Sequence, residues 1–600
     1  MSFTVRNLAC IVLVAMYCSV AAFATGGRFE ITQARNSSTI HIQVAATGNH
    51  TLEIDDTPGF RTPIWKRSFQ GSQLTFDAYE TGLAPGIQYY ARLDRQPTII
   101  MLHVSVGGAS QHPATCSALR STWEIRGRAM LEEHSAVQWS TATNTWAARQ
   151  NQQPEGMQLY YTQYYLLPAV EIAQACDDLS LYEELARYYS VMLTQTVTLG
   201  EAERQSVSEI ARQRPLMSQR TFRAESNKIG DTELGNVQWL YPATKLLRSI
   251  TLLPQNKRSN ILKQFAATYS DFIVNDQLLR FLTRPVRPAP GGGPDVGRVS
   301  VWKLTMQGLK GARVWDTAMS DIDLWLLSCT AEVLGAHAND PELVPLRPEQ
   351  VLELRRAIEV GVLFFRGKRT LHPDTKDFEG KTVGSTTHFN GDYDTLDEFD
   401  YSAVTGGAFP RPDQRRAIHN LPWDTCHAYR IPIFLRALFD NRKATGSDFP
   451  QLQEMRLETN QYVYRVFNGN FSRPLFRNYM DGNDTWFRVD QSRGYGYPPS
   501  EYCDMRGSDR PCMAPGQSMA WGLLSFVNPD LVKLEQALMS LAMSTDYDAK
   551  VFCDRHYSYR GPFRVVQNSS HTYYGDPLFF LVADNADLFV RDSVINVARH

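Results

Sequence analysis

From Glu155 onward, apolar residues recur every three or four positions, and this helical period continues almost to the end of the chain. The stretch from Leu421 to Asn441 is an example. Its residues Ile431, Phe434 and Leu438 have the spacing of one buried helix face. The pattern predicts helices over 156–176, 179–197, 234–252, 257–283, 316–336, 348–366, 424–442, 451–467, 517–526, 529–543 and 573–591.

These segments fall into pairs with a short turn inside each pair, which predicts stacked helical hairpins. Long segments separate the pairs, at residues 284–314, 367–423 and 468–516. Such insertions would encumber an open stack, but they suit a closed ring whose loops gather at one end. The sequence therefore predicts a large all-α domain over 155–600, an (α/α) toroid of five or six hairpins.

The N-terminal region has a different period. Between Arg28 and about Val106, apolar and polar residues alternate between turn signals, which predicts a small all-β sandwich over residues 25–106. The segment TGLAPGIQYYAR at 81–92 resembles the Leu-x-Pro-Gly-x-x-Tyr corner of fibronectin type III domains. That resemblance implies a spacer or binding module. Residues 107–154 are polar and turn-rich, and we expect a linker and lead-in to the next domain.

The first 24 residues are expected to be a signal peptide. Arg6 precedes an apolar run from Leu8 to Val20, and an Ala-Phe-Ala site ends at Ala24. We therefore expect an exported protein, with its destination open. The rest of the chain shows no further run of about 20 apolar residues, so no integral membrane segment is expected.

Seven of the nine cysteines lie beyond the predicted signal, and an odd number leaves at least one thiol without an intrachain partner. Cys503 and Cys512 flank a polar loop and are the predicted disulfide. Cys329 and Cys426 lie in apolar helical patterns and are expected to be buried thiols. No cysteine or histidine spacing is typical of a zinc site.

The formal net charge is only −2, which argues against nucleic acid as the main partner. The sequence has no nucleotide-binding glycine loop and no Gly-x-Ser-x-Gly motif. No cofactor is therefore expected. The sequence does not indicate an oligomeric state.

Two helix starts share the letters Trp-Asp-Thr, at Trp315–Thr317 and Trp423–Thr425. Together with Thr572–Asp576 at the start of the last predicted helix, they resemble features of (α/α)-barrel glycoside hydrolases and polysaccharide lyases. The resemblance implies a carbohydrate substrate, with Trp315, Trp423 and Tyr574 among its binding residues.

Hydrolysis of a glycosidic bond needs a carboxylic acid and a second carboxylate. Asp316 and Asp424 occupy equivalent predicted helix starts and are a natural pair. The alternative is that each is only an N-cap, a position where aspartate is preferred. Asp323, on the same face as Ser320, is interpreted as a buried polar partner and not as a catalyst.

The loop GDYDTLDEFDY at 391–401 carries five carboxylates. Asp397 or Glu398 could supply the acid or base, with Tyr393 as a substrate contact. Several carboxylates also suit calcium, so a calcium site at 392–400 is an alternative, although the EF-hand spacing is absent. A solvated acidic loop is the third possibility.

His427 and Arg430 favour a different chemistry. Lyases abstract the proton beside a uronate carboxylate, commonly with His or Tyr, helped by Arg or Asn. Together with His388, Asn390 and Tyr393 they could form such a set. The stretch RVDQSRGYGYPPSEY at 488–502 is a candidate substrate loop, with the residues Tyr495, Tyr497 and Glu501.

The leading hypothesis is an exported glycoside hydrolase that uses Asp316, Asp424 and the acidic loop. The alternatives are a uronate-specific lyase and a non-catalytic glycan-binding protein. Two carboxyl groups that converge within about 5–10 Å favour hydrolysis. A His–Tyr–Arg cluster without such a pair favours elimination, and scattered carboxylates with aromatic patches favour binding alone.

Overall fold

The computed structural model divides the chain into two compact units, Met1–Pro113 with Phe526–Pro529 and Asn585–His600, and Ala114–Ser525 with Asp530–Asp584. The residues that the structure describes are 29–33, 39–55, 65–77, 88–94, 100–103, 116–150, 152, 156–198, 220–221, 229–283, 285, 287–310, 318–390, 404–414, 422–490, 492, 494–504, 515–544, 546–557, 566–568 and 571–573. The predicted signal peptide and the 81–87 part of the fibronectin-like corner lie outside them.

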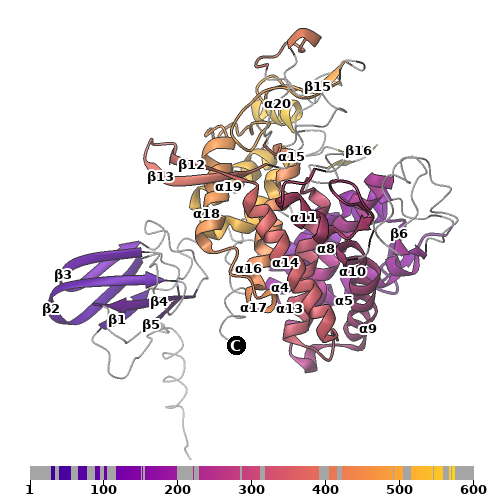
Figure 1. Ribbon diagram of the computed structural model, residues 1–600, viewed down its shortest axis with the longest axis horizontal. Helices are drawn as coiled ribbons and strands as arrows, with labels where there is room; N and C mark the ends of the chain where they lie inside the picture. Colours follow the sequence, from indigo (N-terminus) through magenta and orange to yellow (C-terminus); the bar gives the residue numbers. More distant parts are fainter. Residues whose placement is uncertain are drawn as a thin grey trace, which may run out of the picture. The chain divides into compact units, whose positions relative to one another are not determined.

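One antiparallel sheet makes up the described part of residues 1–113 (Figure 1). Its strands are β1 (Phe29–Gln33), β2 (Thr39–Asp55), β3 (Trp65–Asp77), β4 (Gln88–Leu93) and β5 (Ile100–His103). The long strand β2 pairs with β1, β3 and β4, and β4 pairs with β5. The alternation places Ile42, Val44, Leu52 and Ile54 on the buried face. The predicted sandwich is wrong, because the described strands form a single sheet with no second sheet packed against it.

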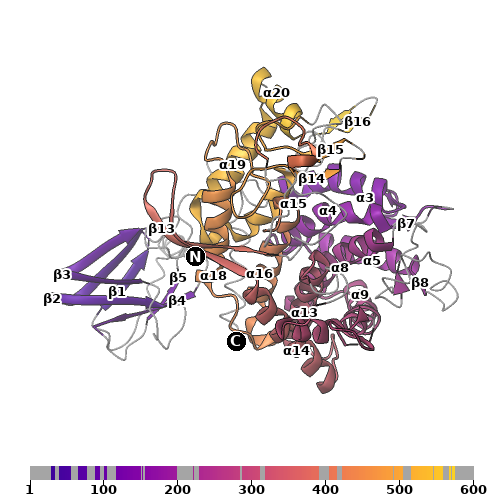
Figure 2. The ribbon, with the colours of Figure 1, turned by 45° about the horizontal axis from the view of Figure 1, so that its top comes forward.

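Four helices form the centre of the second unit: α4 (Gly156–Ala175), α8 (Ile229–Leu252), α13 (Asp321–Asn339) and α16 (Arg430–Asp440). The helix α8 packs against α4 and α13, and α13 packs against α16 (Figures 1 and 2). Almost every residue of α13 from Leu324 to Ala336 is buried. Its sequence is apolar on all sides, as expected of a helix surrounded by other helices.

The remaining helical elements lie around these four or connect them. They are α2 (Cys116–Thr122), η1 (Trp123–Gly127), α3 (Arg128–His134), α5 (Leu179–Thr194), η2 (Gln255–Lys257), α9 (Asn260–Asp271), η3 (Phe272–Leu278), α10 (Leu279–Thr283), α11 (Arg298–Met306), α14 (Pro348–Gly367), η5 (Pro412–Gln414), α15 (Thr425–Ala428), α17 (Arg442–Thr445), α18 (Leu452–Gln461), η6 (Tyr462–Val466), η7 (Pro515–Val527), α19 (Pro529–Met543) and α20 (Tyr547–His556).

Short antiparallel hairpins interrupt the helices. They pair β6 (Val137–Ser140) with β7 (Thr145–Ala148), β8 (Val197–Thr198) with β9 (Arg220–Thr221), β10 (Arg287–Pro288) with β11 (Asp295–Val296), β12 (Arg369–Lys376) with β13 (Thr382–Phe389), β14 (Phe487–Asp490) with β15 (Tyr495–Tyr497), and β16 (Val566–Asn568) with β17 (His571–Tyr573). The prediction of a purely α-helical toroid is therefore wrong. The second unit is mixed, with helices and small sheets interleaved along the chain.

Buried ion pairs cross between the central helices. The carboxylate of Glu171 in α4 lies 2.7 Å from Lys245 Nζ of α8, and that of Glu332 in α13 lies 3.5 Å from Arg248 Nε of α8. The amide of Asn441 also donates to Glu332 at 2.9 Å. Each charge has an opposite charge or a donor beside it, which is the condition for burying ionised groups.

A third buried pair joins α11 to the start of α13. Asp323 accepts two hydrogen bonds from Arg298, at 2.7 and 2.6 Å, and both side chains are almost fully excluded from solvent. The same carboxylate accepts from the backbone N–H and the hydroxyl of Ser320, the N-cap of α13. Asp323 is thus a buried structural partner, as its position in the sequence suggested.

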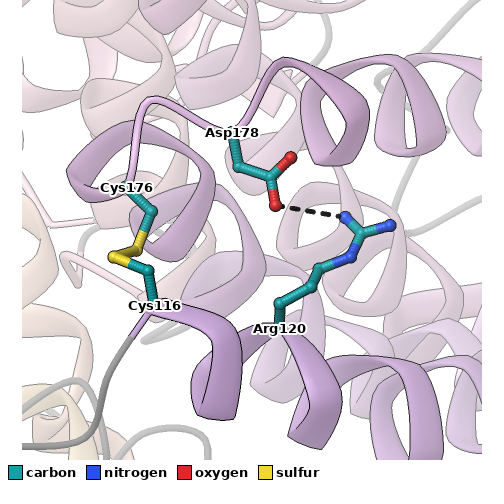
Figure 3. Close-up of a disulfide and its surroundings, with 4 residues drawn as sticks. All are labelled: Cys116, Arg120, Cys176 and Asp178. Atoms are coloured by element: carbon teal, nitrogen blue, oxygen red, sulfur yellow. Dashed lines mark ion pairs between the residues drawn. A yellow bond between two sulfur atoms is a disulfide. The ribbon is translucent and has the colours of Figure 1, made fainter.

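A disulfide between Cys116 and Cys176 joins the start of α2 to the end of α4 (Figure 3). Beside it, Arg120 of α2 lies 3.6 Å from Asp178, the N-cap of α5 (Figure 3). This pairing was not predicted from the sequence. The predicted buried thiol at Cys329 is confirmed, whereas Cys426, which was also predicted to be buried, is partly exposed.

Replacement of Cys116 by serine is expected to lower the free energy of unfolding by about 2–4 kcal/mol, because the bond closes a long loop in the unfolded chain. The cysteines are 60 positions apart. Urea denaturation of the variant and of the parent in non-reducing buffer measures the change. A variant with Cys329→Ala is the control for the loss of a sulfur atom, and Cys176→Ser should match Cys116→Ser, because either change removes the same bond. Equal midpoints for Cys116→Ser and the parent would contradict the expectation.

Candidate active site

Three segments that are distant in the sequence hold the start of α15. The end of β13, residues 422–425 and residues 478–480 run beside one another. Trp423 N–H donates to Phe389 C=O at 3.1 Å, and Met480 N–H donates to Trp423 C=O at 2.8 Å. Thr425 N–H donates to Asn478 C=O at 3.0 Å. This backbone pairing fixes Asp424 at a defined position between two neighbouring strands.

Asp424 is buried and makes two contacts with His427. As the N-cap of α15, its Oδ1 accepts the backbone N–H of His427 at 3.0 Å, while its Oδ2 lies 2.7 Å from His427 Nδ1. Burial would raise the pKa of Asp424, but the interactions with His427, together with the charge of Arg488, outweigh burial and lower it. The carboxylate is therefore ionised at neutral pH and accepts the Nδ1 proton.

This contact leaves the other ring nitrogen of His427 as an acceptor. A neutral imidazole carries one proton, and a carboxylate at Nδ1 selects the tautomer with that proton on Nδ1. The Nε2 lone pair is then available to a reacting group. The side chain of His427 is 22% exposed, whereas that of Asp424 is 8% exposed. An accessible imidazole with a buried carboxylate behind it is the arrangement of a general base and its orienting group.

Tyr429, two residues after His427, connects the site to two central helices. The hydroxyl of Tyr429 accepts from Gln163 of α4 at 2.7 Å and from Gln238 of α8 at 2.8 Å. Burial raises the pKa of Tyr429 well above its ordinary value, so the phenol stays protonated. Because its ring is buried, Tyr429 holds α4, α8 and α16 together and does not face solvent.

Arg430 occupies the first position of α16 and is 1% exposed. Its guanidinium lies 3.3 Å from Asp321 at the start of α13 and 3.4 Å from the hydroxyl of Tyr160 in α4. It also donates to the carbonyl of Cys426 at 3.1 Å. This burial makes Arg430 a positioning residue, which holds a tyrosine hydroxyl beside the start of α15.

Two tyrosines of α4 are partly exposed beside this guanidinium, Tyr160 and Tyr164. Their rings pack edge to face at 6.3 Å, and the Tyr164 hydroxyl reaches that of Tyr429 at 3.4 Å. Burial and the neighbouring tyrosines raise the pKa of Tyr164 well above 10.0, although Arg430 opposes the shift. A protonated phenol can donate a proton, so this pair can supply a general acid.

The hairpin that leads into the site carries a histidine pair. His372 Nε2 of β12 lies 2.6 Å from His388 Nδ1 of β13. Burial, followed by the charge of Arg465, lowers the pKa of His372 to about 4. The pKa of His388 is also lowered to about 4 by burial, opposed by Asn390 and reinforced by Arg465. At neutral pH both rings are uncharged, and one donates to the other.

This pair predicts a loss of stability in mild acid. A histidine in the unfolded chain titrates near 6.5, so below that pH the unfolded state binds more protons than the folded state. The stabilisation is fully present above pH 6.5 and is lost as pH falls towards 4. Urea midpoints between pH 7.5 and 4.5 measure it, and His388→Gln is expected to flatten the decline. An equal decline in that variant would contradict the assignment to this pair.

The structure places only some of the predicted site residues. Trp423 is 1% exposed and packs edge-on against Phe389, so it is a core residue and not an exposed stacking platform. Tyr495 and Tyr497 lie on β15, which pairs with β14, and Glu501 is exposed in the following turn. The described contacts do not bring Glu501 to His427. Outside the described residues lie Trp315, Asp316, Tyr393, Asp397, Glu398, Tyr574, Cys512 and the possible calcium loop at 392–400.

The position of one predicted helix start changes the proposed pair of carboxylates. The helix predicted from 316 begins at Asp321, with Ser320 as its N-cap. Asp321, instead of Asp316, is therefore the carboxylate at the start of α13, and it is paired with Arg430. Five residues of the site were not predicted from the sequence: Tyr160, Gln163, Tyr164, Gln238 and Arg488. The dense aromatic run YYTQYY at 160–165 was the signal that could have directed attention to α4.

Comparisons with protein-family models, with curated proteins and with solved structures found no match to this chain. The candidate site therefore rests on its own geometry and chemistry. Its described centre consists of Asp424 and His427, with Tyr160, Tyr164 and the buried Arg430 beside them.

Proposed function

We propose that this chain is an exported polysaccharide lyase that cleaves a uronate-containing glycan by β-elimination. The observation that carries the proposal is the contact between His427 Nδ1 and the buried, ionised Asp424, which leaves Nε2 to act as the base. The neighbouring tyrosines of α4 supply the second requirement, a protonated donor for the leaving oxygen.

Each proton and bond of the elimination has a place in this scheme. His427 Nε2 takes the proton from C5 of the uronate, the carbon beside the carboxylate. The electron pair of that C–H bond forms the C4=C5 double bond, and the C4–O bond breaks. The hydroxyl of Tyr160 or Tyr164 donates its proton to the departing oxygen. The two products are a glycan with a new reducing end and a glycan with an unsaturated uronate.

The negative charge that develops at C5 spreads onto the uronate carboxylate, so a cation near that carboxylate lowers the barrier. Arg488 is partly exposed, and its charge acts on Asp424. We assign it as the cation that neutralises the substrate carboxylate. Arg430 is buried and paired with Asp321, so its part is to position Tyr160.

Hydrolysis is the alternative that the sequence analysis placed first. It needs a carboxyl group with a raised pKa to protonate the leaving oxygen. At the described site, the pKa of Asp424 is lowered, and Asp321 is paired with Arg430. The other candidate acids, Asp316, Asp397 and Glu398, lie outside the described residues. The described geometry therefore favours elimination over hydrolysis.

Export is part of the same proposal. Besides the predicted signal peptide, support comes from the disulfide between Cys116 and Cys176 and from the disulfide-bonded state of Cys503. Such bonds persist in oxidising compartments. The pairing of Cys503 with Cys512 stays a prediction. Among the described residues, none of the helices combines the length and the apolar character needed to cross a membrane.

The test is product analysis on a panel of neutral and uronate-containing polysaccharides. Both new reducing ends and the ultraviolet absorbance of an unsaturated uronate are recorded. The proposal expects the two signals to rise together on a uronate polymer and to be lost in His427→Gln. Reducing ends without absorbance would replace elimination with hydrolysis, and the absence of both signals would favour a glycan-binding protein.

A further inference from the structure

We propose that Asp424, Cys426 and His427 form a binding site for a soft divalent cation of the zinc class, and that the bound ion turns off the base. The regulatory half of this inference rests on the proposed function, whereas the metal site stands without it. The three residues lie within one turn of chain, in the segment Asp-Thr-Cys-His.

The geometry of the three side chains carries the site. One ligand atom from each residue, a carboxylate oxygen, a sulfur and an imidazole nitrogen, lies within 4.8 Å of the other two. Ligand bonds to zinc are about 2.0–2.3 Å long, so tetrahedral ligand atoms are roughly 3.3–3.8 Å apart. Shifts of about 1 Å by side-chain rotation therefore bring the set to coordinating distance.

The chemistry of the donors selects the ion. Thiolate and imidazole are ligands that zinc and similar transition metals prefer, whereas calcium and magnesium need several oxygen ligands. Cys426 is not part of a disulfide and is partly exposed, as is His427, so an ion can reach both from solvent. Three protein ligands leave the fourth zinc position open to water or substrate.

Nearby positive charges limit which cations the site can hold. Arg430 donates to the carbonyl of Cys426, and the charge of Arg488 acts on Asp424. Both guanidinium groups repel a cation that is bound only by charge. Stable binding therefore requires the thiolate of Cys426, and we expect calcium and magnesium to be excluded.

A metal ion bound at the site would prevent His427 from acting as the base, because it changes the tautomer of the imidazole. The proton on His427 Nδ1 now lies between that nitrogen and Asp424 Oδ2, which are 2.7 Å apart. An ion bound to Nδ1 and to the carboxylate takes the place of this proton. The ring proton then moves to Nε2, and the Cys426 thiol releases its proton to solvent. With Nε2 protonated, His427 has no lone pair to accept the C5 proton of the substrate.

The binding test uses the full-length protein and cobalt(II), which reports thiolate ligands through a charge-transfer absorption in the near ultraviolet. We expect one equivalent of cobalt to produce this band, and one equivalent of zinc to abolish it by displacement. Calcium and magnesium in excess should leave the band unchanged. Absence of the band in the folded parent protein would overturn the metal site without any use of a variant.

Cys426→Ser identifies the thiol that binds. This variant is expected to lose the cobalt band and at least about tenfold in zinc affinity, measured by competition with a chromophoric chelator. Cys329→Ala removes a buried thiol in the central helix α13, far along that helix from its first turn, and should retain the band. Retention of the band in Cys426→Ser, or its loss in Cys329→Ala, would overturn the assignment.

Measurements of cleavage activity with and without zinc separate this inference from the proposed function. Stoichiometric zinc should inhibit the lyase activity of the parent protein, and Cys426→Ser should keep its basal activity and resist inhibition. If the protein binds zinc but cleaves no uronate polymer, the proposed function fails and the metal site stands. If it cleaves such a polymer and zinc has no effect, the regulatory inference fails alone.

Discussion

Asp424→Asn is expected to lower kcat for cleavage of a uronate polymer by about 10³–10⁴-fold, with little effect on folding. Asparagine is as good an N-cap as aspartate, so the start of α15 keeps its backbone hydrogen bond. The amide, however, can present an N–H to His427 Nδ1, which would select the tautomer with the proton on Nε2. Loss of the correct tautomer through an Asp→Asn change has an effect of this size in the serine-protease triad.

The kinetic constants of the variant distinguish catalysis from structure. In Asp424→Asn, kcat should fall while KM changes little, because the residual rate no longer relies on a correctly oriented imidazole. The matched control is Asp546→Asn, which changes the N-cap of α20, whose side chain accepts Ala549 N–H at 2.9 Å. Full activity in Asp424→Asn would remove His427 from the mechanism.

Asp323→Ala is expected to lower the free energy of unfolding by about 3–5 kcal/mol. The change leaves the Arg298 guanidinium buried without its carboxylate, and it also removes the acceptor of the Ser320 N–H and hydroxyl. An uncompensated buried charge costs more than the lost contact itself. Chemical denaturation followed by circular dichroism measures the change.

Two further variants make this prediction specific. Asp413→Ala removes a carboxylate from an ion pair with Arg411 that is more than two-thirds exposed, and should change stability by less than about 1 kcal/mol. The double variant Arg298→Met, Asp323→Leu removes both charges and should recover much of the loss. A double variant that is no more stable than Asp323→Ala would show that the pair, and not the unpaired charge, carries the stabilisation.

The helices were predictable where burial imposes a period. The expected helices at 156–176, 179–197, 348–366 and 529–543 correspond to α4, α5, α14 and α19 within a few positions. In these segments the apolar positions alone define the buried face. The start of α13 was less predictable. The Trp-Asp-Thr sequence predicted a helix start at Asp316, but the capping contacts between Ser320 and Asp323 place the start at Asp321.

The errors in fold class arose where the pattern is short or polar. The hairpin of β12 and β13 lies inside the segment 367–423, which was predicted to be a long insertion between helix pairs. Its strands have only weak alternation, and several of their exposed residues are polar. For the N-terminal region, alternation predicts strands correctly, but it does not say whether those strands form one sheet or two.

The candidate site shows the same division between local and distant information. Asp424, His427 and Arg430 could be grouped from the sequence because they lie three residues apart on one stretch of chain. The partners from α4, α8 and α13 could not be grouped with them. Those contacts depend on how the central helices pack, and neither spacing nor composition specifies that packing.

The most direct test of the account is to run the cleavage reaction in water labelled with heavy oxygen and to weigh the products by mass spectrometry. Elimination takes no oxygen from water at the cleaved bond, so we predict an unlabelled unsaturated product that is lighter than the hydrolysis product by one water. The fragment with the new reducing end should carry only the label that its reducing-end oxygen takes up by slow exchange with water. A control without enzyme measures that exchange. A labelled, saturated product would contradict β-elimination and would indicate that the site belongs to a hydrolase.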